Sequence, residues 1–228
     1  MAAEATALPR ALIAGIGRFH VEERVTEFPI GWEETDRDAV WAGRQLARWG
    51  VDRGSYVLVT AAVWQGPWVS PVLRAVRLAG ATFGMADTFG WDARRTATFA
   101  SRLPLSMIFG LGAATAEALS DSGQLADLFG GVPAILAHPG AHPVLAGSGL
   151  HPGLVAFLGP ALAVECPQRA GAHVNAAEWL VQESAGGLCI SVVGPRAYRA
   201  QRVPLGLPGG VVTGPCECGS MDPRVRLG

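Results

Sequence analysis

The sequence predicts an α/β fold, with a parallel sheet flanked by helices and followed by a small, mostly β subdomain. Short β-branched runs alternate with helical segments from residue 36 to residue 136, which is the pattern of a parallel sheet with crossover helices. Beyond residue 160, short apolar runs are separated by Gly, Pro and polar turns instead. A chain of 228 residues can bury a full core. We therefore expect an α/β lobe over residues 1–159 and a small β subdomain over residues 160–228.

Each expected element has its own signal in the sequence. Residues 36–49 predict an amphipathic helix that Thr35 or Asp36 can cap and that Gly50 ends. Residues 56–62 (YVLVTAA) form the short β-branched run of a buried parallel strand. The alternation continues with helices over 68–78, 93–101 and 113–120 and with strands over 81–85, 106–109 and 132–136. In the second unit we expect short strands over 162–164, 179–181, 188–193 and 211–213.

The composition excludes several classes of function. All 18 basic residues are arginine, so Schiff-base chemistry on a lysine and a lysine phosphate clamp are both excluded. A formal net charge of −1 gives no electrostatic footprint for nucleic acid or for an anionic membrane. Residues 1–17 contain Glu4 and Pro9 and show no cleavage site after an apolar core. We therefore expect no signal peptide and a cytoplasmic protein.

A long uncharged stretch sets one part of the chain apart. Between Asp127 and Glu165 there is no Asp, Glu, Lys or Arg, and five prolines and seven glycines interrupt the stretch, so it cannot be a membrane span. Its titratable side chains are His138, His142 and His151. We expect a buried, loop-rich pocket wall in which histidine supplies any acid–base chemistry near neutral pH. The alternative is that these are loop histidines held by main-chain hydrogen bonds.

Three cysteines and a histidine predict a metal site. Cys166 and His173 form one close pair, and Cys216 and Cys218 form a second. Two such pairs, brought together by a fold, supply the four tetrahedral nitrogen and sulfur ligands that zinc prefers. A site with four protein ligands is closed, which indicates a structural metal. Cys189 lies within an apolar run and is expected to be a buried strand residue. The alternative is that all four cysteines are ordinary reduced thiols.

Several of these segments resemble the phenylacetate–CoA ligase branch of the adenylate-forming ligases. FLGPALAVEC (157–166) is similar to that family's Gly-Pro-x-x-x-x-Glu-Cys stretch, and GAHVN (171–175) to its Gly-Leu-His segment. PCECGSMDPRVRL (215–227) resembles its Pro-Cys-x-Cys-Gly-Arg-x-His-Pro-Arg segment. LARWGVDRGSYVLVT (46–60) and VRLAGAT (76–82) resemble upstream family segments more weakly. The resemblance implies that the cysteines and the histidine of the three stronger segments bind zinc.

The sequence departs from the family where the family binds its nucleotide. The family's Tyr-Gly-Leu-Ser/Thr-Glu falls on residues 152–156, so Val155 replaces a nucleotide-contacting hydroxyl and Ala156 replaces a magnesium-binding carboxylate. Leu207 stands at the ribose-binding aspartate, and His138 at the glutamate of Gly-Glu-Pro. The chain has no phosphate loop rich in Ser, Thr and Gly, and it ends where the family's hinge and C-terminal domain would begin. These departures predict that the protein does not use ATP to form adenylates.

The resemblance and its departures together suggest an ATP-independent enzyme of secondary metabolism. It would carry out acid–base chemistry (cyclisation, dehydration or isomerisation) on an aromatic or polyketide-like acyl intermediate, whether free, CoA-linked or carrier-linked. The candidate catalytic residues are, in order, His138, His151 and His142, because an apolar shell favours the neutral, base-competent imidazole. By resemblance, an aromatic-rich segment borders the family's aromatic-acid pocket. The candidate substrate-binding residues in it are Trp64, Trp68, Phe83, Phe89 and Trp91, and the alternative for these side chains is plain core.

Two other functions stay open at this point. A non-catalytic partner or regulatory protein, derived from an aryl-CoA ligase, would expose a sizeable apolar patch. An aryl-CoA ligase acting with a separate C-terminal subunit is the third hypothesis. The sequence names neither the substrate nor the oligomeric state, so self-association into a homo-oligomer is left open.

Overall fold

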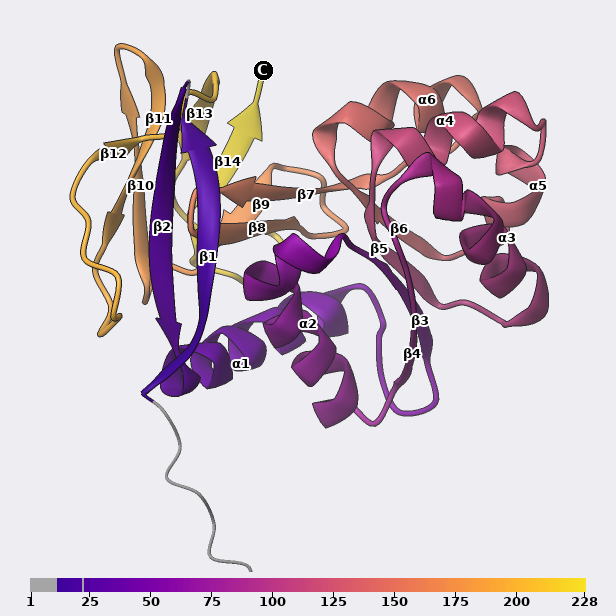
Figure 1. Cartoon of the computed structure of the whole chain (residues 1–228), viewed down its shortest axis with the longest axis horizontal. Helices are drawn as coiled ribbons and strands as arrows, with labels where there is room; N and C mark the ends of the chain where they lie inside the picture. Colours follow the sequence, from indigo (N-terminus) through magenta and orange to yellow (C-terminus); the bar gives the residue numbers. More distant parts are fainter. Residues whose placement is uncertain (1–11, 22) are drawn as a thin grey trace, which may run out of the picture.

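The computed structural model describes residues 12–21 and 23–228, and a nine-stranded sheet runs through most of them (Figure 1). Four strand pairings are parallel and four are antiparallel, and the change occurs at β7 (Gly153–Leu158). The parallel strands besides β7 are β3 (Tyr56–Thr60), β4 (Thr82–Ala86), β5 (Met107–Leu111) and β6 (Ala134–Ala137). The antiparallel strands that continue the sheet are β8 (Ala161–Glu165), β9 (Ala172–Val174), β14 (Arg224–Leu227) and β13 (Gly209–Val212).

Helices cover both faces of the parallel strands (Figure 1). On one face lie α1 (Trp32–Arg48) and α2 (Gly66–Leu78). On the other face lie α3 (Ala93–Arg102), α4 (Ala113–Asp121), α5 (Leu125–Phe129) and α6 (His142–Gly147). Three 3₁₀ turns connect the elements, namely η1 (Val63–Gln65), η2 (Gly90–Asp92) and η3 (Pro139–Ala141). None of the described helices is both long and apolar enough to cross a membrane.

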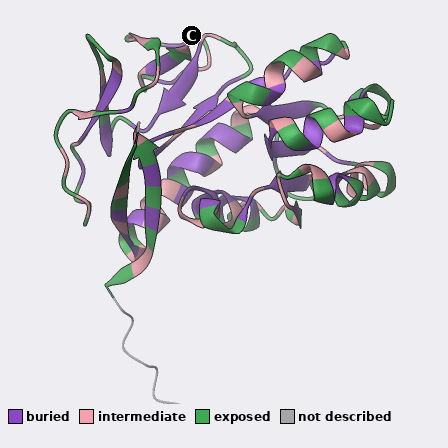
Figure 2. Cartoon of the chain, turned by 45° about the horizontal axis from the view of Figure 1, so that its top comes forward, coloured by how far each residue is buried: buried purple, intermediate pink, exposed green. Residues whose placement is uncertain are grey.

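Alternate side chains of each parallel strand enter two separate cores, as the period of two in a strand requires. In β3, Val57 and Val59 pack against α1 and α2, whereas Leu58 packs against the other helix layer. In β5, Phe109 joins the first core and Ile108 the second. Figure 2 shows the result, with buried strands at the centre and exposed outer faces on the helices.

A second, smaller β layer packs on the antiparallel half of the sheet. It consists of β10 (Trp179–Ser184), β11 (Gly187–Val192) and β12 (Val203–Pro204). Its inward side chains share one core with β7, β8 and β14. A two-stranded hairpin, β1 (Ile13–Val21) with β2 (Arg24–Gly31), lies beside this layer in Figure 1. The β-rich second half expected from the sequence is therefore present.

The expected boundary at residue 160 coincides with the change from parallel to antiparallel pairing. The β7–β8 hairpin spans this residue, and four residue pairs, from Val155–Val164 to Leu158–Ala161, hold it together. The large sheet therefore continues through the point at which the texture of the sequence changes. The division of the chain into two units there stays a prediction.

The uncharged stretch is not the loop-rich wall that we expected. It contains β6, η3, α6, β7 and most of β8. The prolines that suggested loops lie at the ends of these elements, because proline is tolerated in the first turn of a helix and before a strand. Pro139 begins η3, Pro143 is the second residue of α6, and Pro133 and Pro152 directly precede β6 and β7.

Helix α1 begins at Trp32, earlier than the cap expected at Thr35 or Asp36. Its N-cap is Gly31, and the first turn contains Glu33 and Glu34, which suit the positive end of the helix dipole. This extra turn places Glu34 against the second half of the chain, where its carboxylate accepts a hydrogen bond of 2.7 Å from the main chain of Ala197.

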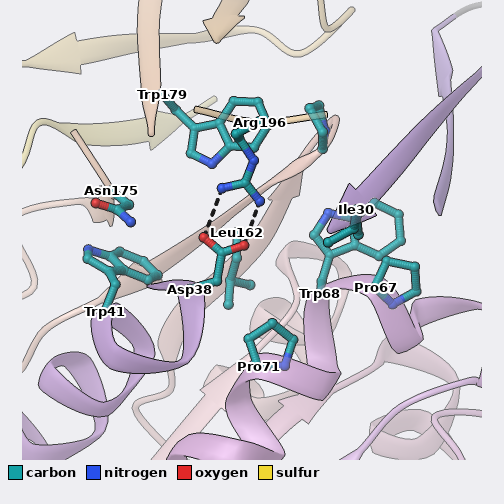
Figure 3. Close-up of a pocket in the computed structure, with 11 residues that line it drawn as sticks. Ile30, Asp38, Trp41, Pro67, Trp68, Pro71, Leu162, Asn175, Trp179 and Arg196 are labelled. Carbon is teal, nitrogen blue, oxygen red and sulfur yellow. Dashed lines mark hydrogen bonds and ion pairs between the residues drawn. The ribbon is translucent and has the colours of Figure 1, made fainter. Parts of the chain in front are cut away.

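A buried ion cluster fixes α1 to the β-rich half. The guanidinium of Arg196 lies 2.6 Å from Asp38 and 2.8 Å from Glu178, and 3.3 Å from Glu34. Arg37 adds a second ion pair to Glu178 at 2.6 Å. The charged end of Arg196 also lies 4.4 Å from the centre of the Trp179 ring. Figure 3 shows Asp38 and Arg196 facing each other between tryptophan and proline side chains.

Candidate functional site

The four predicted metal ligands lie together in the structure. Cys166 follows β8, His173 is the central residue of β9, and Cys216 and Cys218 lie in the turn that leads into β14. Their four ligand atoms are all within 4.8 Å of one another. Cys166 Sγ is 3.8 Å from Cys216 Sγ, and Cys218 Sγ is 3.4 Å from His173 Nε2. A tetrahedral zinc ion with bonds of about 2.3 Å needs sulfur atoms roughly 3.8 Å apart, so the arrangement fits zinc.

A tight turn presents Cys216 and Cys218 on the same side. The N–H of Gly219 donates to the Cys216 carbonyl at 2.8 Å, and the N–H of Cys216 donates to the Ser220 carbonyl at 2.9 Å. Gly219 has φ of +83°, a left-handed conformation that favours glycine. The sequence Cys-x-Cys-Gly therefore forms a knuckle with both sulfur atoms directed at His173 and Cys166.

Asp222 orients His173. Its carbonyl lies 3.3 Å from Nδ1 of His173, and a donor–acceptor contact at Nδ1 leaves Nε2 free for a metal. The Asp222 carboxylate in turn accepts hydrogen bonds from the Trp41 indole at 3.0 Å and from the N–H of Ala176 at 3.2 Å. Helix α1 thus supports the candidate metal centre through Trp41 and Asp222.

Burial sets the protonation of the candidate ligands. Burial lowers the pKa of His173, which keeps the imidazole neutral, as a metal ligand must be. Burial raises the pKa of the Cys166 thiol to about 12, so a nearby cation is needed to hold it as a thiolate near neutral pH. Cys189 lies in β11, outside this group of ligand atoms, and is buried as expected.

The three histidines of the uncharged stretch occupy different environments. His138 is half-buried between β6 and η3, with its ring centre 4.8 Å from that of Phe157. Nε2 of His142 lies 3.2 Å from the Ala137 carbonyl at the start of α6. His151 is exposed, contrary to the expected burial, and its carbonyl accepts a hydrogen bond of 2.6 Å from Arg169. Among the three, His138 is the histidine whose ring contacts an aromatic side chain, that of Phe157.

Burial lowers the pKa of His138 to about 4, although a hydrogen bond to the main chain of Val155 acts in the opposite direction. The imidazole is therefore neutral at pH 7. A neutral imidazole carries a proton on one ring nitrogen and a lone pair on the other. The nitrogen with the lone pair can accept a proton or a hydrogen bond from a bound molecule.

A row of aromatic rings in contact with one another extends from His138. Phe157 in β7 stacks on Trp68 in α2 with ring centres 4.6 Å apart, and Trp64 meets Trp68 edge-on at 6.4 Å. The Trp68 indole also donates to the Gly159 carbonyl at 3.0 Å, which fixes its position. We call His138, Phe157, Trp68 and Trp64 the aromatic row. Phe157 was not singled out from the sequence, although it stands two residues after Val155 in the same strand.

The other expected aromatic residues lie elsewhere. Phe83 in β4 lies under the guanidinium of Arg77, 5.0 Å from the ring centre. Phe89 and Trp91, before and within η2, are 43% and 72% exposed. The structure therefore joins Trp64 and Trp68 to His138 and places the remaining three outside the aromatic row.

A small cavity lies beside the aromatic row (Figure 3). Trp68, Trp41 and Trp179 line it together with Asp38 and Arg196. Its volume of about 20 Å³ holds about one water molecule. In this conformation the space is too small for an aromatic acid.

The residues that the resemblance aligns with the nucleotide contacts of the phenylacetate–CoA ligases are apolar and largely buried. Val155 and Ala156 lie in β7 and are 0% and 3% exposed. Leu207 is half-buried in the segment between β12 and β13. None of the three side chains offers a charge or a hydrogen-bond donor to a nucleotide.

Comparison with solved structures shows the fold of the adenylate-forming acyl- and aryl-CoA ligases. The chain is similar to an open form of 2-hydroxyisobutyryl-CoA ligase, with a TM-score of 0.69 and 15% identity over 96% of this chain and 57% of that one. The N-terminal subdomain of Klebsiella oxytoca NpsA gives a TM-score of 0.57 and 14% identity, over 92% and 57% of the two chains. O-succinylbenzoate coenzyme A synthetase (MenE) from Bacillus subtilis gives 0.59 and 11%, over 94% and 61%.

No family model and no curated protein matches the sequence. The chain spans about three fifths of the length of the ligases it resembles. At these identities the likeness concerns the fold alone. The expected α/β ligase-like fold is confirmed, whereas the phenylacetate–CoA ligase branch stays a prediction.

Proposed function

We propose that this chain is a ligase-fold enzyme that does not form adenylates and that moves a proton on a flat acyl compound bound against the aromatic row. The compound would be aromatic or polyketide-like, and the reaction a cyclisation, dehydration or isomerisation. The observation that carries the proposal is the position of His138, a neutral imidazole in ring contact with Phe157. His142 and His151 rank below it, because no ring contact joins either of them to the aromatic row and His151 is exposed.

The chemistry follows from the protonation state of His138. With a pKa of about 4, the ring can accept a proton from an acidic carbon or hydroxyl of the substrate, but it carries none to donate at pH 7. Proton transfer creates an imidazolium next to an enolate, and the attraction between these opposite charges raises the pKa of the ring while the intermediate lasts. The same proton can then return to a different atom of the substrate, which completes an isomerisation without a net change of charge.

We also propose that Cys166, His173, Cys216 and Cys218 hold one zinc ion with a structural role. Three thiolates and a neutral imidazole are a donor set that zinc favours. With four protein ligands the ion has no open position for substrate. Its contribution would be to join β8, β9 and the turn before β14, which together support β7 and Phe157.

Hydrogen exchange into phenylacetyl-CoA tests the catalytic proposal. The protein is incubated with this thioester in D2O, and deuterium at the carbon next to the carbonyl is followed by NMR. We expect the wild type to accelerate exchange and His138→Gln to slow it by about a hundredfold or more, the usual effect of removing a general base. The rate should be constant from pH 5 to pH 8 and fall as the pH drops through about 4, where His138 becomes protonated.

His142→Gln and His151→Gln are the matched controls, and both should exchange at the wild-type rate. A wild-type protein that does not accelerate exchange contradicts the proposal, and so does a fully active His138→Gln variant. Either result favours the non-catalytic partner instead. That alternative is supported by the exposure of Trp64, Phe89 and Trp91 (60%, 43% and 72%), which is typical of an interaction surface.

A further inference from the structure

Arg224 is a buried arginine without a carboxylate partner. It lies in β14 and is 7% exposed. Its side chain donates one hydrogen bond, from a terminal nitrogen to the Gly214 carbonyl at 3.3 Å. Its Nε has no hydrogen-bond partner among the described residues. No ion pair involves it in the part of the chain that the structure describes. Arg196, which is as deeply buried, has three carboxylates around it.

An unpaired buried charge is costly, because the ion loses its hydration and gains nothing in return. A guanidinium stays charged in a protein, so it cannot escape this cost by losing a proton. The position of Arg224 therefore requires a negative charge nearby. The candidate metal centre is the group that can provide it.

The register of the sheet places Arg224 beside that centre. In the antiparallel pair of β14 and β9, Arg224 stands directly opposite His173, so both side chains project from the same face of the sheet at close range. The strands approach closely because Gly171 has no side chain, and a Cβ there would lie 3.2 Å from the Cβ of Arg224.

An occupied metal centre would carry a net negative charge. A zinc ion with three thiolates and one neutral imidazole carries a single negative charge in a largely buried position. One guanidinium next to it gives a neutral unit. With an ion of the same charge but a ligand set of two thiolates and two imidazoles, no such counter-charge would be needed.

We propose that Arg224 is the counter-charge of the metal centre. Its positive charge favours a divalent ion held by three thiolates and one imidazole. This inference rests on the proposed metal centre. Arg224 does not touch the ion, and it stabilises the ionised form of the ligands from the neighbouring strand. The same residue would destabilise the metal-free protein, because its charge is then uncompensated.

Cobalt binding and thermal unfolding of charge variants test the inference. Co2+ is titrated into chelator-stripped protein in competition with a chromophoric chelator, and the melting temperature is measured with and without the metal. Arg224→Met should weaken Co2+ binding by about 10- to 100-fold, the usual effect of changing a residue next to the ligands. Arg224→Lys keeps the charge and should stay within about threefold of the wild type. Arg226→Met removes the same charge from an exposed position of β14 and should leave binding unchanged.

The melting temperatures separate a counter-charge from a packing role. Arg224→Met should melt at or above the wild-type temperature without metal and below it with metal. An arginine that only packs would lower both values, and that result overturns the inference, as does unchanged Co2+ affinity in Arg224→Met. A wild-type protein that takes up no Co2+ overturns the metal centre itself, and with it the role of Arg224. The two failures are therefore distinguishable.

Discussion

Cys216 and Cys189 are a matched pair of buried thiols, one inside the candidate metal centre and one outside it. We expect protein purified without added zinc to contain one zinc ion per chain, and Cys216→Ser to lose most of it. Loss of a structural metal is among the largest single-residue effects on stability, so the melting temperature should fall by on the order of 10 °C. Metal analysis by mass spectrometry and a thermal melt provide the measurements.

Cys189→Ser is the control for this prediction. It introduces the same chemical change in β11, and it should keep the full metal content. A Cys216→Ser variant with full zinc content and an unchanged melting temperature would remove the metal assignment. Reduced thiols without a metal would then be the better description of all four cysteines.

Single residues could be predicted from the sequence where the chemistry is local. The four candidate ligands follow from spacing and from the resemblance, and His138 follows from its position in the uncharged stretch. Phe157 and Arg224 could not be found in this way. Their roles depend on the partner strand and on the pairing register, and a single-residue shift in register would turn either side chain to the opposite face.

At the scale of elements, the contact between α1 and the β-rich half depends on the buried ion cluster around Arg196. Removing the guanidinium leaves Glu34, Asp38 and Glu178 with Arg37 as the remaining cation. Breaking a buried ion pair from one side typically costs about 3–5 kcal/mol. We therefore expect Arg196→Met to lower the free energy of unfolding by about that amount, measured by urea denaturation.

Arg18→Met is the matched control at an exposed ion pair. Arg18 and Glu27 are 2.7 Å apart on the β1–β2 hairpin, and both side chains are more than half exposed. Pairs of this kind contribute less than about 1 kcal/mol. If the two variants lose similar stability, the cluster around Arg196 does not hold α1 to the rest of the fold.

The parallel elements were predictable because apolar periodicity and Gly ends mark them within a few residues. The start of α1 was missed because Gly31 caps the helix without a side-chain hydrogen bond, whereas Thr35 and Asp36 have side chains that can cap a helix. The β1–β2 hairpin was missed as well. Its glycines and Pro29 suggest loops, yet proline is tolerated in a strand that pairs on one side.

At the scale of the whole molecule, the fold combines a parallel and an antiparallel half in one sheet. The sequence predicted both halves, but it could not show that β7 belongs to both. That depends on hydrogen bonds to β6 on one side and to β8 on the other. This position bears on the proposed function, because β7 contains Val155 and Ala156 and also Phe157 of the aromatic row.

This arrangement predicts that the protein does not bind ATP. The fold is that of adenylate-forming ligases, but Val155, Ala156 and Leu207 stand where the resemblance places a hydroxyl and two carboxylates. A hydrogen bond to a charged group contributes about 1.5–3 kcal/mol, and each 1.4 kcal/mol is a factor of ten in affinity. Three such losses weaken binding by roughly a thousandfold or more.

Calorimetric titration with Mg-ATP should therefore show no binding heat at sub-millimolar concentrations, with Mg2+ alone as the blank. A clear isotherm, or release of pyrophosphate with an aryl acid, would instead support a ligase that works with a separate C-terminal subunit.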